Sequence, residues 1–469
     1  MRPVLLRSLF GTLLLGSLCA AGACGADTVV VVDPEGGVPD RSAGTAETAV
    51  SEDAAAKPLV DASIEDAADA ADASLLSPTF VHRDINHVLG TGQSLSVGAV
   101  GSPALSTTQP YDNTMFVTGV IAGGTGLTSF EPLVEATVET MSSSFASLVT
   151  KMARDQILIG QPAGKTSHDL LVRAHGVGGR PYAFLKKGGT GTAYANGIAQ
   201  ATAGHDLAVA GNKTYVVRAV TNVHGESDHQ LANADYEANV LEWQANYETD
   251  VKAISGQTES IPMLHSQFSS WTRLAGQLPT SIIPGAQLAA HISAPGKVIL
   301  VGAKYHLQHV ADGVHLTNAA YRHMGEDYAK VYRRVILEGK TWEPLRPQTI
   351  TRVGAVVTVK MHVPAPPLVI DTTLVTDPGK NGFEWRDDGP TTPTIVSVAV
   401  AGPDTVTVTL SAAPTGANKR LRYAYTGTPG ALGGPTTGPR GNLRDSDATS
   451  SRDGFALYNW AVHFDAASP

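Results

Sequence analysis

The sequence has very little cysteine, and both of its cysteines, Cys19 and Cys24, lie close to the N-terminus. Only 16% of its 469 residues are charged and only 6% are aromatic, and the net charge is −9. The lack of cysteine excludes a small domain stapled by disulfides, and the length and composition exclude a collagen or a coiled coil. The acidic balance argues against a nucleic-acid partner. A chain of this length is expected to form two or three domains around a sizeable core.

A long hydrophobic run is also missing near the N-terminus, where the apolar residues 9–18 are too few to cross a membrane. Arg2 and Arg7 precede this run and small residues follow it, which predicts a secretory signal peptide over residues 1–24. The segment Ala21-Gly22-Ala23-Cys24 resembles the lipobox at which bacterial lipoproteins are cleaved and lipidated. We therefore expect an exported chain lipidated at Cys24, at the cell surface or in the periplasm. Ordinary cleavage, giving a freely secreted chain, is the alternative.

Under either cleavage the mature chain keeps at most one cysteine, so we expect no intramolecular disulfide. Residues 25–78 contain no aromatic residue, twelve acidic residues and two basic ones. Such a composition cannot bury enough apolar surface to offset the entropy of ordering, so we predict a disordered acidic linker. Because the linker carries −10 and the signal peptide carries +2, residues 79–469 account for only −1 of the total of −9. The negative net charge of the chain therefore belongs to the linker. Any association with a membrane is expected through a lipid on Cys24.

Residues 79–345 have the pattern of an α/β domain with a mostly parallel sheet. Apolar runs typical of buried strands alternate there with longer helical patterns. The predicted strands are residues 85–89, 170–174, 214–223 and 297–301, and the predicted helices are residues 130–153, 231–254 and 318–337. The loops that follow parallel strands meet at the carboxyl edge of the sheet, which is where open α/β folds bind their ligands.

Residues 346–469 change to a period of two, which predicts a C-terminal β-sandwich. The predicted strands are residues 353–363, 395–400, 406–410, 420–425 and 455–464, with a hairpin turn at residues 401–404. This accessory domain is expected either to pack on the first domain or to bind glycan. Its aromatic candidates fit a core better than a sugar platform; they are Trp385, Tyr423, Tyr425, Tyr458 and Trp460.

Three polar segments follow predicted strands in the α/β region. Ser94 lies on a glycine turn, where a hydroxyl can serve as a nucleophile or simply belong to a loop. His224 opens a junction in which Ser227 and Asp228 can line a site or cap the next helix. Asp312-Gly313-Val314-His315 can place a carboxylate against Nδ1 of the imidazole and leave Nε2 free to accept a proton.

In this order the segments resemble those of the SGNH (GDSL-type) hydrolase superfamily, and most closely its sialate O-acetylesterase-like branch, which is also called carbohydrate esterase family six. The matching motifs lie between residues 80 and 340 and are Gly92-Gln93-Ser94, Tyr111-Asp112-Asn113, Gly178-Gly179, His224-Gly225-Glu226-Ser227-Asp228 and Asp312-Gly313-Val314-His315-Leu316. The resemblance implies a three-layer α/β/α SGNH-hydrolase-like domain. It also implies a nucleophile at Ser94, a general base at His315 and a residue that orients the base at Asp312.

The resemblance further implies an oxyanion hole, the group of N–H donors that stabilises the tetrahedral intermediate. Its donors are expected to be the backbone N–H groups of Ser94 and Gly179, with Gly178 as the alternative for the second. His224 stands where this branch often has glutamine and is the candidate for the third donor, with Ser227 as the fallback. Two further residues are expected behind the site, where they hold its loops by hydrogen bonds; they are Gln93 and Glu226.

The sequence predicts a secreted serine esterase that removes acetyl groups from carbohydrate or another small ester. A lipase or thioesterase with a longer acyl pocket fits the same residues, and a non-catalytic glycan-binding surface protein is the rival from another class. His306, His309 and Asp312 have the spacing of a metal site, but Asp312 is better used by His315, so we expect no metal and no cofactor. The oligomeric state is left open.

Overall fold

The computed structural model describes residues 75–160 and 166–469, which fall within one compact unit. The predicted signal peptide, Cys24 and the predicted linker up to residue 74 lie outside the described residues. None of the helices in the described part of the chain combines the length and the hydropathy needed to cross a membrane.

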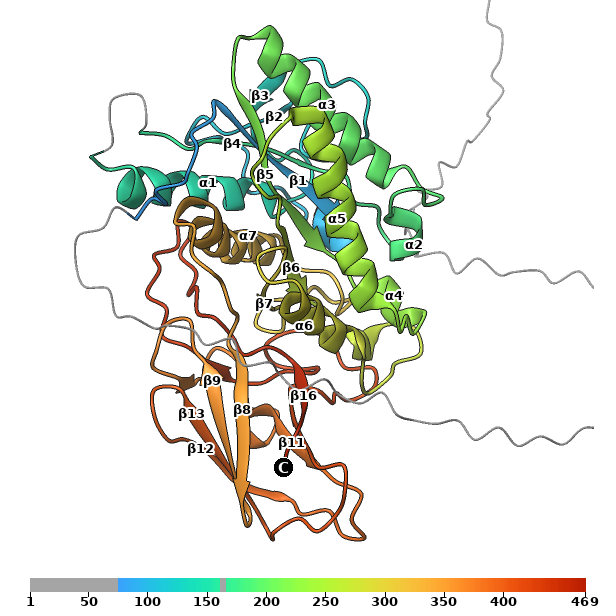
Figure 1. The fold of residues 1–469 in the computed structure, drawn as a ribbon. Helices are drawn as coiled ribbons and strands as arrows, with labels where there is room; N and C mark the ends of the chain where they lie inside the picture. The colour runs from blue at the N-terminus through green and yellow to red at the C-terminus, as the bar shows by residue number, and fades with distance from the viewer. Residues whose placement is uncertain (1–74, 161–165) are drawn as a thin grey trace, which may run out of the picture. The chain divides into compact units, whose positions relative to one another are not determined.

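The first part of the fold is a seven-stranded sheet in the order β3-β2-β4-β1-β5-β6-β7 (Figure 1). All neighbouring strands are parallel except β2 and β3. β4 and β5 are buried throughout, which explains why both are mostly apolar, although each also buries one arginine, Arg173 or Arg218. The strand bounds are β1 (Ile85–Gly92), β2 (Thr114–Phe116), β3 (Phe130–Pro132), β4 (Leu170–Ala174), β5 (Tyr215–Val223), β6 (Met263–Gln267) and β7 (Val298–Ala303).

Helices cover both faces of this sheet, as predicted (Figure 1). One core cluster joins the sheet to α1 (Ser142–Met152) and α7 (Asn318–Tyr332). A second cluster, on the other face, joins it to α3 (Ala193–Ala210), α5 (Tyr236–Ser255) and α6 (Ile283–Ser293). Shorter helical segments are η1 (Ser94–Val97), η2 (Ala153–Ile157), α2 (Tyr182–Leu185), α4 (Glu226–Gln230), η3 (Trp271–Arg273), η4 (Arg333–Leu337) and η5 (Lys380–Gly382).

The helix predicted over residues 130–153 is wrong in its first half, because α1 begins only at Ser142. Residues 130–132 form the edge strand β3, where Pro132 is tolerated although it cannot donate a hydrogen bond. The helix predicted over residues 231–254 begins at Tyr236, after a break at which Ala232 has a φ of +49°. The predicted helix over residues 318–337 is confirmed, with a wider π-helical turn in its last five residues.

The C-terminal part consists of antiparallel sheets, in the orders β12-β13-β9-β8, β11-β14-β16 and β10-β15. The inner faces of the two larger sheets share one hydrophobic core, as in a sandwich. The strand bounds are β8 (Arg346–Val353), β9 (Val356–His362), β10 (Val369–Ile370), β11 (Phe383–Arg386), β12 (Ile395–Val400), β13 (Thr405–Leu410), β14 (Arg420–Tyr423), β15 (Leu443–Arg444) and β16 (Phe464–Ala467).

Two of the predicted C-terminal strands differ from those observed. Val353 ends β8, and Gly354 turns the chain into β9, so residues 353–363 are not one strand. Residues 455–463 are mostly irregular because their backbone bonds to loops and to single residues, for example Val462 N to Leu345 O, instead of to a ladder. The predicted hairpin at residues 401–404 is confirmed by the pairing of β12 with β13. The five candidate aromatic side chains are buried or half-buried, so none is an exposed sugar platform.

Candidate active site

Ser94 lies just past the carboxyl end of β1, the central strand of the parallel sheet. Gly92 has a φ of +126°, and a Cβ on it would lie 2.2 Å from the carbonyl oxygen of Val223. Only glycine therefore allows β1 to turn so close to the end of β5. The turn leaves Ser94 half-buried as the first residue of η1, and its hydroxyl has no hydrogen-bond partner among the described residues.

The glycine pair that follows β4 lies beside Ser94. Val177 N donates to Gly92 O at 3.1 Å, and a Cβ on Gly178 would lie 3.6 Å from Ser94 Cβ. The backbone N–H groups of Gly178 and Gly179 donate to no residue that the structure describes. The predicted oxyanion donors after β4 are thus next to the predicted nucleophile, and these two N–H groups are not used elsewhere in the described fold.

His175 anchors this glycine segment to the helices behind it. Its Nδ1 is 3.0 Å from Gln200 Oε1 on α3, and its Nε2 is 2.7 Å from the hydroxyl of Tyr247 on α5. Burial lowers the pKa of His175 to about 4, so the ring is neutral at pH 7. Because both nitrogens are engaged, His175 positions the loop and has no free nitrogen for proton transfer.

Asp312 and His315 form the pair that the sequence predicted, in the loop between β7 and α7. Asp312 Oδ2 lies 2.7 Å from His315 Nδ1, and Asp312 Oδ1 accepts from the backbone N–H groups of Val314 and His315 at 2.8 and 2.9 Å. Burial acts to raise the pKa of Asp312, but the hydrogen bonds from His315 and Val314 outweigh it, and the pKa falls below its usual value. The carboxylate therefore holds the tautomer that bears a proton on Nδ1, and Nε2 has no partner within the described chain.

Contacts bring the loop that follows Ser94 to the start of α7, close in sequence to His315. Ala99 N donates to Ser94 O at 3.0 Å, and the hydroxyl of Tyr321 donates to Ala99 O at 2.8 Å. Leu95 and Leu316, each adjacent in sequence to one of the two residues, belong to one core cluster. No hydrogen bond joins Ser94 Oγ to His315 Nε2 among the described residues. Catalytic hydrogen bonds are often long without substrate and tighten when it binds.

His224 has no free N–H for a substrate. Its Nδ1 lies 2.7 Å from the hydroxyl of Tyr236, its Nε2 lies 3.0 Å from Arg180 O, and the residue is 1% exposed. Burial lowers the pKa of His224, which leaves a neutral ring whose two nitrogens are both occupied. The fallback, Ser227, is also buried, and its N–H lies 3.2 Å from Gln93 Oε1. Gln93 therefore links the Gly92–Ser94 turn to the loop after β5.

Glu226 is held behind the site by Lys304, a residue that the sequence analysis missed. Lys304 Nζ lies 3.2 Å from Glu226 Oε1, and the two side chains are 3% and 2% exposed. Burial acts to raise the pKa of Glu226, but the charge of Lys304 outweighs it and the pKa is lowered. The sequence does contain a sign of this pair, because Lys304 directly follows the apolar strand β7. A lysine buried at the end of such a strand needs a partner of opposite charge.

One of the matching motifs, Tyr111-Asp112-Asn113, lies away from Ser94. Asn113 accepts hydrogen bonds from Thr150 and from Leu170 N, so the Tyr-Asp-Asn segment supports the amino end of β4, opposite the edge that bears Ser94. Ser96, two residues after Ser94, is buried and donates its hydroxyl to Gln93 O at 2.7 Å. Its hydroxyl is therefore not available for attack on a substrate.

A loop of the C-terminal part contacts the loop that carries Asp312 and His315. Gly433 N donates to Gly313 O at 2.9 Å, and Leu432 packs so closely that a Cβ on Gly313 would lie 2.6 Å from it. Thr272, which follows β6, donates its hydroxyl to Ala431 O at 2.8 Å. The C-terminal part therefore packs on the first domain and supports the loop that carries the candidate base.

Comparisons with known proteins give similarity at the level of structure. No family model matches the sequence, and no curated protein matches it. A carbohydrate acetylesterase from Xanthomonas citri is 15% identical with a TM-score of 0.49, over 81% of this chain and 80% of that one. A carbohydrate acetylesterase from Sinorhizobium meliloti is 12% identical with a TM-score of 0.30, and the match covers 52% of this chain and 97% of that chain. The aryl esterase of M. smegmatis is 13% identical with a TM-score of 0.31, and the match covers 53% of this chain and 98% of that chain. Likeness this remote says nothing about which reaction this chain performs.

Proposed function

We propose that this protein is a serine esterase of the SGNH type that hydrolyses carboxylic esters, with acetylated carbohydrate as its substrate class. One observation carries the proposal. The Asp312–His315 pair has a free Nε2 within the described chain, and α7, which follows its loop, bonds to the segment after Ser94, while two backbone N–H groups beside Ser94 are unused. The preference for acetylated carbohydrate rests on the resemblance to the esterase motifs. The proposed export rests on the signal-peptide pattern of residues 1–24, and the proposed tether rests on the lipobox-like segment that ends at Cys24.

In the proposed mechanism, Ser94 Oγ attacks the carbonyl carbon of the ester while His315 Nε2 takes the hydroxyl proton. The N–H groups of Ser94 and Gly179, or of Gly178 in place of the latter, receive the negative oxygen of the tetrahedral intermediate. His315 then gives its proton to the departing alcohol, which leaves an acyl ester on Ser94. Water activated by His315 hydrolyses this ester and restores the hydroxyl. Asp312 stabilises the charged imidazole throughout.

The test compares the wild-type chain with Ser94→Ala on 4-nitrophenyl acetate and on an acetylated oligosaccharide, with released nitrophenol and acetate as the readouts. Ser102→Ala is the matched control, because Ser102 is exposed and lies in the same loop. We expect activity in the wild type and in the control, and loss of activity in Ser94→Ala. Unchanged activity in Ser94→Ala would exclude Ser94 as the nucleophile. An inactive wild type would favour a glycan-binding protein, and faster hydrolysis of octanoate than acetate would favour a lipase.

A further inference from the structure

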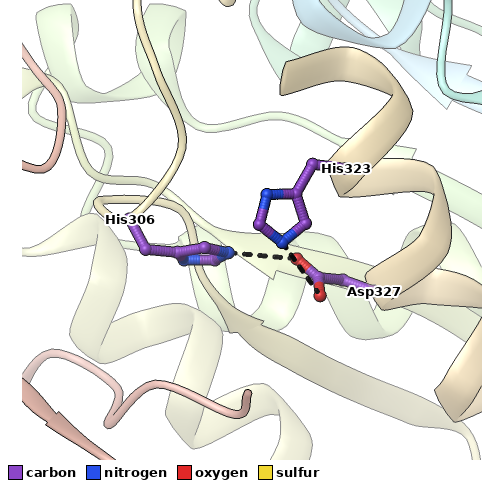
Figure 2. A group of neighbouring side chains, drawn as sticks. All are labelled: His306, His323 and Asp327. Carbon is purple, nitrogen blue, oxygen red and sulfur yellow. Dashed lines mark hydrogen bonds and ion pairs between the residues drawn. The ribbon is translucent and has the colours of Figure 1, made fainter. Parts of the chain in front are cut away.

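A second group of histidine and aspartate side chains lies apart from the Asp312–His315 pair. His306 follows β7, whereas His323 and Asp327 lie one turn apart on α7, and Figure 2 shows both rings directed at the Asp327 carboxylate. His306 Nε2 is 3.1 Å from Asp327 Oδ2, and His323 Nε2 is 4.0 Å from Asp327 Oδ1. One nitrogen or oxygen from each residue lies within 4.8 Å of the others. This group, the His306–His323–Asp327 cluster, replaces the grouping of His306 with His309 and Asp312 that the spacing suggested.

The cluster is enclosed, and its carboxylate has no cationic side chain as a partner. The side chains of His306, Asp327 and His323 are 6%, 14% and 17% exposed. No lysine or arginine of the described residues forms an ion pair with Asp327, because Lys330, one turn further along α7, pairs with Asp447. A carboxylate removed from water requires a compensating charge. Among the described residues, the charge of Lys330 therefore reaches Asp327 only from a distance and without an ion pair.

The two rings are held in place by aromatic neighbours from the C-terminal part. His306 stacks on Trp460 at an interplanar angle of 15°, and His323 stacks on Phe455 at 2°. His323 Nε2 is buried and has no hydrogen-bond partner among the described residues. The stacking thus fixes a ring nitrogen that faces a carboxylate but does not bond to it.

The donor types fit a site for a cation. Imidazole nitrogen and carboxylate oxygen are both ligands of divalent transition metals, and zinc sites in proteins commonly combine them.

We propose that His306 Nε2, His323 Nε2 and one carboxylate oxygen of Asp327 bind a single Zn²⁺ ion, with a water molecule as the fourth ligand. Ligand atoms in a tetrahedral zinc site lie about 3.3 Å apart, and the three donor atoms here lie within 4.8 Å of one another, so they have to close by at most about 1.5 Å. A cavity of about 20 Å³, lined in part by His306 and Asp327, has room for the water. The ion joins the end of β7 to α7 and so holds both ends of the loop that carries Asp312 and His315.

The experiment removes metal from the full chain with a chelator and then titrates it with Zn²⁺ by calorimetry. Co²⁺ is the spectroscopic probe, since tetrahedral Co²⁺ absorbs visible light strongly. We expect one ion per wild-type chain, a tetrahedral Co²⁺ spectrum and a higher Tm with Zn²⁺. Loss of a supporting partner outside the ligand set costs about 10–100-fold in metal affinity, so His323→Asn, which removes a ligand, should bind at least about 100-fold more weakly.

His205→Asn is the matched control, because His205 forms an exposed surface pair with Asp206, and this variant should bind the ion as the wild type does. Asp327→Asn, which keeps the shape of the side chain, is the second variant if His323→Asn does not fold without metal. A wild-type chain that binds no stoichiometric Zn²⁺ would overturn the proposal. So would a folded His323→Asn or Asp327→Asn chain that binds Zn²⁺ as tightly as the wild type.

Discussion

Two histidine–aspartate pairs lie within one stretch of the chain and differ in their surroundings. In the first, His315 Nδ1 and Asp312 Oδ2 are 2.7 Å apart, and the Asp312 side chain is 43% exposed. In the second, His306 Nε2 and Asp327 Oδ2 are 3.1 Å apart, and both side chains are nearly buried. In the exposed pair the second imidazole nitrogen has no partner among the described residues, whereas the buried pair has a further histidine beside it. The same two residue types are therefore suited to proton transfer in one place and to metal binding in the other.

The largest effect should come from removing one histidine of each pair and measuring ester hydrolysis. General base catalysis contributes about 10²–10⁴-fold to a rate, so His315→Ala should lower kcat by that amount. His306→Asn should lower kcat by much less, because the described partners of His306 are Asp327, His323 and aromatic rings outside the candidate active site. Equal losses in the two variants, measured on 4-nitrophenyl acetate with folding checked by circular dichroism, would contradict the division of roles.

The contrast between buried and exposed charges extends to stability. Lys304→Met leaves the buried carboxylate of Glu226 without its cation, which should lower the free energy of unfolding by about 3–5 kcal/mol. His315→Ala breaks a pair whose acid is well exposed and should cost only about 0–1 kcal/mol. Urea denaturation measures both values, and the double variant Lys304→Met/Glu226→Gln should recover part of the loss. If Lys304→Met alone had the same free energy of unfolding as the wild type, Glu226 would not be charged in the folded protein.

Buried histidines should also make stability fall in acid. Burial lowers the pKa of His463 from 6.5 to about 4, so the unfolded chain binds more protons between these values and stability decreases as the pH falls through them. The pH-dependent contribution of this one ring is at most about 3 kcal/mol. Urea midpoints of the wild type at pH 7 and pH 5 should therefore differ more than those of His463→Gln. An equal difference in the two proteins would show that His463 does not titrate in this way.

A smaller effect is expected at the contact between the C-terminal loop and the exposed pair. Gly313 has a φ of +73° and is packed against Leu432, whereas Gly354 has a φ of +58° with open space around it. Alanine at either position strains the backbone by about 1–2 kcal/mol. Only Gly313→Ala should also displace the Asp312–His315 loop, and a displacement of about 1 Å lowers kcat by up to about 10²-fold. Equal kcat values for the two variants would show that the contact does not position the pair.

The sequence predicted most of the first domain, because the strands of a parallel sheet are continuous apolar runs and its long helices are periodic. It missed β6, whose second half is polar (His265, Ser266 and Gln267), and it extended a helix through Pro132, which lies on an edge strand. These errors have one cause, since pairing across the sheet decides such segments and local pattern does not.

Contacts between residues close in the sequence could be predicted for the candidate site, whereas contacts between residues far apart in the sequence could not. Asp312 and His315 are three residues apart and meet within one turn, so their pairing follows from spacing. Glu226 and Lys304 are 78 residues apart, and His306 meets Asp327 only because α7 packs beside β7. The same holds for His224, whose nitrogens are bonded to Tyr236 and Arg180, contacts that only the fold creates.

The central claim is that Ser94 is a nucleophile activated by His315, and covalent labelling tests it most directly. The purified chain is treated with a fluorophosphonate, which modifies activated serines, and the adduct is located by mass spectrometry. We predict one adduct per chain, on Ser94, that is absent in Ser94→Ala and forms at least about 10²-fold more slowly in His315→Ala. An adduct on another residue, or equal labelling of Ser94 in the wild type and in His315→Ala, would contradict the account.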